Sequence, residues 1–329
     1  MQQALKSPFY FPIERRLYEV APGLKPLGYD FGNSDYDQKI FQITPHFGEF
    51  RKNKVACRKE RLSKYFATAN LTSQQTHILA QFIIENLVKE YPSLFMFNSQ
   101  NMIFTSQLTG DRLTLNSSYQ LVEFKNLKNE NTDPKPAHIL DALALQFEED
   151  YALCSRRSDM TDDLSMIHLC SGSHWACEDK IGKSFLQVHS PIPHFDKIGK
   201  VSTNMIEAMI NKGPFVRFVW SFVTDTRLNH HPIAPTGIDQ NMWKGRSFNS
   251  QLTIPFYLRV ERQVVYGLPE IDSSFFGIGI SFIDGNKIKS DTNMRENLIG
   301  ALNSMSPESR IYKGVDSCFT ELMNWLNNS

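Results

Sequence analysis

The chain lacks long hydrophobic runs and has no excess of charge of either sign. None of its 329 residues lies in a stretch that approaches the roughly 20 apolar residues of a membrane span. The N-terminal segment MQQALKSPFYFPIERRLYEV has no signal-peptide apolar region. Basic and acidic residues number 35 each, and no Lys/Arg-rich run stands out. We therefore expect binding to neither membranes nor nucleic acid.

Cysteine is scarce, and several familiar motifs are missing. The five cysteines are an odd number without the spacing of a disulfide framework, which favours a reducing, cytoplasmic location. No cysteine spacing suits an iron–sulfur cluster. The chain also has no GxGxxG, Walker A, GxSxG or HExxH motif. A redox role would therefore need electrons from another protein.

Apolar residues, in contrast, are plentiful. Hydrophobic residues make up 41% of the chain and charged residues 21%, which is a globular composition. The 24 phenylalanines and 11 methionines suit a core that wraps a large flat apolar ligand, and equally an ordinary core. We expect residues 1–92, an irregular arm and helices, to pack on a core of residues 93–329 as one integrated domain.

The most informative segment is 251–269, QLTIPFYLRVERQVVYGLP, which reads as a long apolar strand with charges in its middle. Strand alternation places Tyr257, Arg259, Glu261 and Gln263 on one face, and Arg262 on the other among Leu258, Val260 and Val264. Charges inside a sheet cost stability unless they are partnered, so the pattern indicates a polar ligand or a functional pocket. The alternative is an edge strand with a solvated Arg–Glu pair.

A second strand is expected at 274–283, SFFGIGISFI. One face carries Phe276, Ile278, Ile280 and Phe282. The opposite face carries Gly277 and Gly279, and glycines spaced by two leave room for close approach of a ligand or a packed helix.

The remaining pattern predicts an α+β architecture of antiparallel strands between a helix-rich start and a helical end. A capping box at Thr72 and Gln75 begins a helix that Pro92 stops. Other helices are expected at 51–67, 139–153 and 206–210, with two or three more at the C-terminus. Strands are expected at 94–97, 102–107, 112–115, 164–170 and 216–223, with a brief extended segment at 185–188.

Two segments contain candidate metal ligands. In VHSPIPH the prolines would hold His189 at the start of a stiff, non-helical segment, which suits a metal or haem ligand as well as a structural histidine. The segment HLCSGSHWAC offers His168, Cys170, His174 and Cys177 as zinc ligands. Their spacing matches no usual pairing, so a plain strand-to-loop transition is the alternative.

Four blocks of sequence resemble the haem-dependent oxidative N-demethylase family, the haem-binding subunit of dimethylamine monooxygenase. They are QFEEDYALC at 146–154, GSHWACEDKIGK at 172–183 leading to VHSPIP at 188–193, FVWSF at 218–222, and LRVERQVVYGLP at 258–269. The N-terminal PLGYDFGNSDYDQK and the helix ending at Tyr91–Pro92 fit as well, so the resemblance covers nearly the whole chain.

This resemblance implies a PAS-like antiparallel sheet core, flanked by helices, that holds haem b. The enzyme would use O2 to oxidise a methyl group of a small secondary amine, releasing formaldehyde and the shorter amine. Electrons would come from NADPH through a separate reductase with FMN and an iron–sulfur centre. The protein could also form an oligomer, which the resemblance leaves open.

The resemblance, combined with strand parity, indicates a set of site residues. His189, within the HxPxP block, is our choice for the proximal ligand of the haem iron, with His194 and His168 as fallbacks. Arg259 and Arg262 are candidates for the haem propionates, although they lie on opposite faces. Glu261 would hold a protonated amine or orient Arg259. The expected haem or pocket contacts are Trp175, Trp220, Tyr257, Gly277 and Gly279.

The chain departs from the family pattern at two places. It has Gly172-Ser173-His174-Trp175 where Pro-Ser-x-Trp is usual, and Val219-Trp220 where Asn-Trp is usual. Both lie in expected pocket segments, which leaves the substrate open. The alternatives are a haem-dependent hydroxylase of another small molecule, a haem sensor or carrier without turnover, and a non-haem protein.

Overall fold

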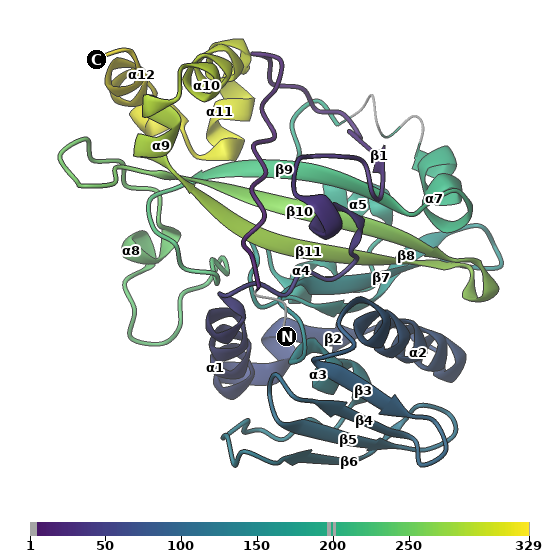
Figure 1. Cartoon of the computed structure of the whole chain (residues 1–329). Helices are drawn as coiled ribbons and strands as arrows, with labels where there is room; N and C mark the ends of the chain where they lie inside the picture. Colours follow the sequence, from purple (N-terminus) through teal and green to yellow (C-terminus); the bar gives the residue numbers. More distant parts are fainter. Residues whose placement is uncertain (1–4, 196–198, 200–201, 329) are drawn as a thin grey trace.

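Two antiparallel sheets form the framework of the computed structural model, which describes residues 5–195, 199 and 202–328 (Figure 1). The larger sheet has seven strands in the order β1-β9-β10-β11-β7-β8-β2. Their bounds are β1 Lys25–Pro26, β9 Phe215–Val223, β10 Tyr257–Leu268, β11 Ser273–Asp284, β7 Asp150–Arg156, β8 Asp162–His168 and β2 Phe66–Thr68. The long pair β10 and β11 lies at its centre.

The smaller sheet is a four-stranded meander at one end of the molecule, drawn at the bottom of Figure 1. Its strands are β3 Phe95–Asn98, β4 Ile103–Ser106, β5 Asp111–Leu115 and β6 Leu121–Asn126. The first three match predicted strands, whereas β6 was not expected from the sequence. Phe95, Phe104 and Leu113 from this sheet share a buried core with Phe275 of β11. The two sheets are therefore joined by one continuous core.

Helices precede, interrupt and follow the strands along the chain. They are α1 Phe47–Tyr65, α2 Ser73–Glu90, α3 Ile139–Ala144, α4 Cys177–Lys180, α5 Phe185–His189, α7 Ser202–Asn211, α8 Gln240–Lys244, α9 Gly285–Ser290, α10 Thr292–Ser304, α11 Pro307–Lys313 and α12 Phe319–Asn327. The capping box of α2 is confirmed, because Thr72 and Gln75 bond to each other's backbone N–H groups. The α+β arrangement of antiparallel sheets and helices is confirmed, while the PAS-like character of the core stays a prediction.

Two predicted elements are wrong. The helix expected to continue to residue 153 ends at Ala144, and Asp150–Arg156 forms strand β7 between β11 and β8. Pairing with one strand on each side outweighs the short helical pattern there. The segment expected to be extended at 185–188 is instead α5, since Ser184 and Gln187 form a second capping box.

Different segments pack on the two faces of the large sheet. As predicted from strand parity, Arg259 and Glu261 lie on one face and Arg262 on the other. The face that carries Arg259 and Glu261, here called the loop face, packs against residues of the 169–188 segment and Leu228. The face that carries Arg262 and Val260, here called the arm face, packs against the N-terminal arm and the C-terminal helices. Figure 1 shows the purple arm crossing in front of β9, β10 and β11.

Candidate functional site

Arg259 and Glu261 lie buried on the loop face. The exposed fraction of Arg259 is 0% and that of Glu261 is 8%. The guanidinium of Arg259 donates to the carbonyl oxygens of Leu228 and Ser171, and its Nε lies 3.9 Å from Oε1 of Glu261. Because β10 pairs with β9 and β11 on its two sides, the edge-strand alternative is wrong.

Three further buried or partly buried cations gather near Glu261 and Lys313, and no sequence pattern singled them out. They are Arg217 of β9, Arg246 of the loop that follows α8, and Lys313 at the end of α11; with Arg259 we call these four residues the cation cluster. Glu261 acts electrostatically on Arg217, Arg259 and Lys313, and Arg246 acts on Lys313. Burial lowers the pKa of Lys313 to about 8.

Some nitrogens of the cation cluster lack partners in the described part of the chain, although Arg259 donates to two carbonyl oxygens and Lys313 donates to that of Trp220. The buried Nε atoms of Arg217, Arg246 and Arg259 have no hydrogen-bond acceptor among the residues that the structure describes. Buried polar groups of native proteins are almost always paired, so such atoms indicate the place of an anionic ligand. Arg217 sits in the apolar run FVRFVW, where the rule that singled out Arg259 would also have found it.

His189 ends the short helix α5, so the predicted non-helical setting is wrong. Its Nδ1 lies 2.7 Å from the carbonyl oxygen of Phe185, and its ring stacks on Phe195 with centroids 5.3 Å apart. A carbonyl only accepts, so Nδ1 carries the proton. Burial, and the nearby charge of Arg217, lower the pKa of His189 to about 4, which keeps the imidazole neutral. The lone pair of Nε2 is therefore available to a metal.

The two fallback histidines have other environments. His194 is exposed, and its Nε2 lies 3.0 Å from the hydroxyl of Ser306. His168 is fully buried on β8, with Nε2 3.3 Å from Asp141 and Nδ1 3.9 Å from the sulfur of Cys170. Of the three histidines, His189 has Arg217 of the cation cluster as a charged neighbour.

The predicted contact residues divide between the two faces. Trp175 packs in the loop-face cluster together with Phe276 and Phe282, and Tyr257 meets Phe282 edge to face with centroids 6.4 Å apart. All four side chains are only partly buried. They form a half-open aromatic wall on the same face as Arg259.

Trp220, Arg262, Gly277 and Gly279 lie on the arm face, so one flat ligand cannot contact both sets. Trp220 packs with the C-terminal helices. Arg262 donates to the carbonyl oxygen of Lys39 at 2.7 Å, within the arm. The space beside the glycines is filled, since a Cβ at Gly277 would meet the ring of Phe275 and one at Gly279 would meet Glu149. These residues therefore do not share a pocket with Arg259, and their expected contacts with haem stay predictions.

The expected group of four zinc ligands is also not assembled. Cys177 turns its sulfur to the carbonyl oxygen of Ile167 at 3.8 Å. The ring of His174 packs on His230, and burial together with Arg246 lowers the pKa of His174 to about 3. His168 and Cys170 do lie together, but their third neighbour is Asp150.

Two cavities open on the same side of the large sheet. One of about 430 Å³ lies between α1 and the loop around Leu228, and its lining includes Cys57, Glu60 and Trp243. The other, of about 410 Å³, is lined in part by Tyr257 and Asp225. No local pattern in the sequence indicates the first cavity, because its walls come from segments about 170 residues apart, such as those of Cys57 and Asn229.

A family model described as "Haem-dependent oxidative N-demethylase, alpha subunit-like" matches residues 33–323. The chain belongs to this family. The family description implies an oxidative, haem-dependent enzyme, and the words "alpha subunit" point to partner subunits. No helix among the described residues is long and apolar enough to cross a membrane.

The loop face has the donor set that haem needs. A neutral imidazole with its Nδ1 proton engaged suits an axial ligand, and guanidinium Nε atoms without acceptors suit two carboxylates. The aromatic wall suits the apolar macrocycle. These residues fit the cofactor of the family, and the arm-face residues do not join them.

Proposed function

We propose that this family member is a haem-dependent monooxygenase that removes a methyl group from a small amine. His189 would bind the iron of haem b through Nε2, and the hydrogen bond of Nδ1 to Phe185 is the observation that carries the proposal. Such a bond orients a metal-bound imidazole and sets its tautomer.

The propionates would pair with the cation cluster. Arg217 and Arg259 approach from neighbouring strands of the loop face, where Ser221 and Val219 of β9 face Arg259 and Glu261 of β10. Two carboxylates from the cofactor would supply acceptors for guanidinium nitrogens that otherwise stay buried and unpaired. Trp175, Phe276 and Phe282 would cover the apolar part of the ring.

Bound haem would supply the binding and reductive activation of O2. One oxygen atom enters a C–H bond of the methyl group, and the other leaves as water with two electrons and two protons. The C–N bond of the hydroxylated amine then breaks, which releases formaldehyde and the shorter amine. The electrons would come from NADPH through a partner reductase that carries FMN and an iron–sulfur centre. The five free cysteines agree with a cytoplasmic location for this chemistry.

Glu261 would position the amine, and Arg259 would position Glu261. The carboxylate accepts a hydrogen bond from Gln263 at 2.9 Å and faces Arg259 at 3.9 Å, so it is oriented from two sides. Its negative charge is the feature that an ammonium group would recognise, with Asp150 and Asp225 as further carboxylates near Arg259. The lost family residues before Trp175 and Trp220 leave the identity of the amine as the open part of this proposal.

The test is an optical spectrum of protein purified after expression with a haem precursor, recorded in the ferric, dithionite-reduced and CO-bound forms. We expect a Soret band that shifts with CO. Amine-dependent NADPH consumption with an added reductase, and formaldehyde release in proportion, should follow. A haem protein without amine turnover would support a sensor or carrier instead. A folded protein that cannot take up haem would overturn both interpretations.

A further inference from the structure

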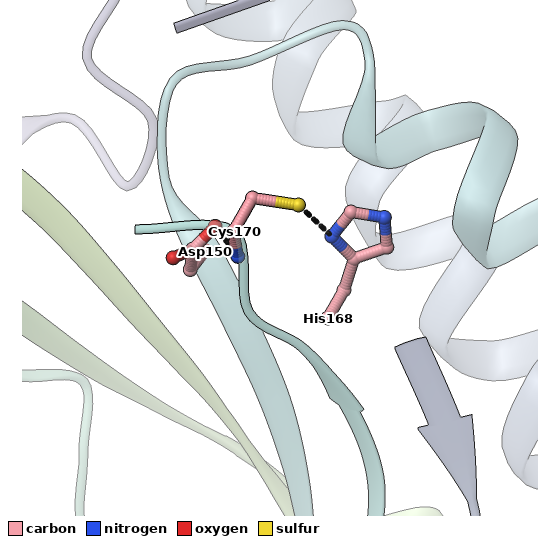
Figure 2. Close-up of side chains that lie close together, drawn as sticks. All are labelled: Asp150, His168 and Cys170. Carbon is pink, nitrogen blue, oxygen red and sulfur yellow. Dashed lines mark hydrogen bonds between the residues drawn. The ribbon is translucent and has the colours of Figure 1, made fainter. Parts of the chain in front are cut away.

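A second group of donor side chains is buried where β7 begins and β8 ends. Asp150, His168 and Cys170 each offer one ligand atom, and these atoms all lie within 4.8 Å of one another (Figure 2). All three residues are at most 1% exposed. None of the three was counted in the cation cluster or the aromatic wall, although Asp150 lies near enough to Arg259 to act on its charge.

His168 is oriented as metal-bound histidines usually are. Its Nδ1 lies 3.9 Å from the sulfur of Cys170, and Figure 2 shows the two side chains pointing toward each other. Two such ligands on tetrahedral zinc lie about 3.6 Å apart. The other nitrogen, Nε2, lies 3.3 Å from Asp141, whose carboxylate Arg58 holds at 2.8 and 3.0 Å. A carboxylate behind the imidazole is the second layer that fixes a histidine on a metal.

Cys57 of α1 is a candidate for the fourth ligand, although its sulfur lies outside the group of three ligand atoms within 4.8 Å of one another and would have to turn toward them. The two cysteines pack together with Tyr65, and the sulfur of Cys57 lies 3.6 Å from the carbonyl oxygen of Cys170. Asn229 approaches the same sulfur at 3.4 Å with an N–H donor, while the Cys57 thiol can itself donate to the carbonyl oxygen of Cys170. Cys57 also lines the 430 Å³ cavity, which would give an ion an entry path.

A divalent ion would offset part of the negative charge buried here. Lys54 is fully buried beside Asp150, and its ammonium donates to the carbonyl oxygens of Ala144, Phe147 and Glu149. Glu148 and Glu149 also act on Lys54. A divalent cation would balance the two thiolates, and its attraction for Asp150 would reduce the cost of burying that carboxylate.

We propose that Cys57, Asp150, His168 and Cys170 bind one zinc ion in a closed, structural site. Two sulfurs, an imidazole and a carboxylate are a donor set that selects zinc over calcium or magnesium. The ion would tie α1 to the ends of β7 and β8. It would also anchor the loop after residue 170, where the carbonyl oxygen of Ser171 receives the guanidinium of Arg259.

The test uses the full chain, with or without haem, incubated with equimolar zinc salt and then exhaustively dialysed. Elemental analysis should give about one zinc per chain. X-ray absorption at the zinc edge, which reads only the ligands of zinc, should show two sulfurs at about 2.3 Å and lighter donors at about 2.0–2.1 Å. Haem content, read from the Soret band of the same samples, reports on the proposed function separately.

Cys170→Ser should lose most of the zinc, and Cys154→Ser, a cysteine elsewhere on β7, should keep it. If Cys170→Ser does not fold, the absorption spectrum of the unaltered chain still decides. A folded wild-type chain that holds no zinc, or a zinc shell without sulfur, would overturn the proposal. Undiminished zinc in a folded Cys170→Ser variant would overturn it as well.

Discussion

The imidazole of His189 donates from Nδ1 to the carbonyl oxygen of Phe185, one helical turn earlier, over 2.7 Å. This bond leaves the proton on one nitrogen and the lone pair on the other. The same short helix aims the ring, because Ser184 and Gln187 cap its first turn. A neutral, aimed imidazole beside unpaired arginines is the relationship on which the haem proposal depends.

Replacing His189 by alanine should remove the axial ligand. We expect His189→Ala either to purify without haem or to show altered ferric and CO-bound spectra. His194→Ala is the matched control, since that exposed ring bonds to Ser306 and should leave the spectra unchanged. Identical spectra for His189→Ala and the unaltered chain would show that His189 does not bind the iron.

Replacing Arg217 by methionine should weaken haem binding through the propionates. A charge-assisted hydrogen bond contributes about 1.5–3 kcal/mol, so the affinity for haem should fall roughly 10- to 100-fold. Haem dimethyl ester, which lacks the carboxylate charges, should bind the variant and the unaltered chain equally. Arg262→Met should keep the affinity, because Arg262 lies on the arm face. Equal losses with haem and with its ester would argue for a packing effect instead.

Replacing Glu261 by glutamine should weaken the amine and spare the cofactor. The amide keeps an acceptor for Gln263 but loses the charge that attracts an ammonium group. We expect a roughly tenfold rise in KM at unchanged haem content, measured by formaldehyde release and by the Soret band. Glu270→Gln, a change at an exposed position beyond β10, is the control. Parallel loss of haem and turnover would remove the substrate role.

Glu90 should make stability depend on pH. Burial raises its pKa to about 7 from the ordinary 4.5, while the carboxylate accepts N–H bonds from Ile40 and Phe41. The folded chain then binds more protons than the unfolded chain between pH 4.5 and 7. The stabilising contribution is complete below pH 4.5 and is lost as the pH rises through 7.

Glu90→Gln should therefore flatten the fall in the free energy of unfolding across this range, measured by urea denaturation. Glu85→Gln, an exposed change on the same helix, should leave the slope as it was. An unchanged slope in Glu90→Gln would mean that Glu90 is already ionised in the folded protein at low pH.

Replacing Arg58 by methionine should destabilise the fold strongly. Arg58 and Asp141 form a fully buried bidentate pair, so the variant leaves a buried carboxylate with the imidazole of His168 as its remaining side-chain partner. The expected loss is about 3–5 kcal/mol in the free energy of unfolding. Lys59→Met, at the adjacent exposed position of α1, should change it by less than about 0.5 kcal/mol. A loss of that small size in Arg58→Met would show that Asp141 is protonated or paired elsewhere.

Local patterns alone predicted much of the framework. The Thr72 capping box, the long strand around Arg259 and the apolar strand at 274–283 all form as expected. Strand parity correctly separated Arg259 and Glu261 from Arg262. These features follow from residues close in sequence and from the fixed alternation of a strand.

The helix predicted through residue 153 failed for a reason that lies outside the segment. The spacing of Ile139, Leu143 and Phe147 is helical, but β7 is selected by its pairing with β8 and β11. Glu148 and Glu149 also turn away from a helix to accept the N–H groups of Thr44 and Gln42 in the arm. Long-range partners of this kind leave no local signal.

The sequence by itself determined the family resemblance, the strand faces and the candidate types of side chain. Only the tertiary structure decided which of them meet. Glu261, Arg217 and Arg246 meet Lys313 from separate segments, and Asp150 joins His168 and Cys170, with Cys57 packed on Cys170, in place of His174 and Cys177. The physical reason is that hydrogen bonding and burial across the sheet set these distances, whereas sequence spacing sets only the direction in which each residue leaves its own strand or helix.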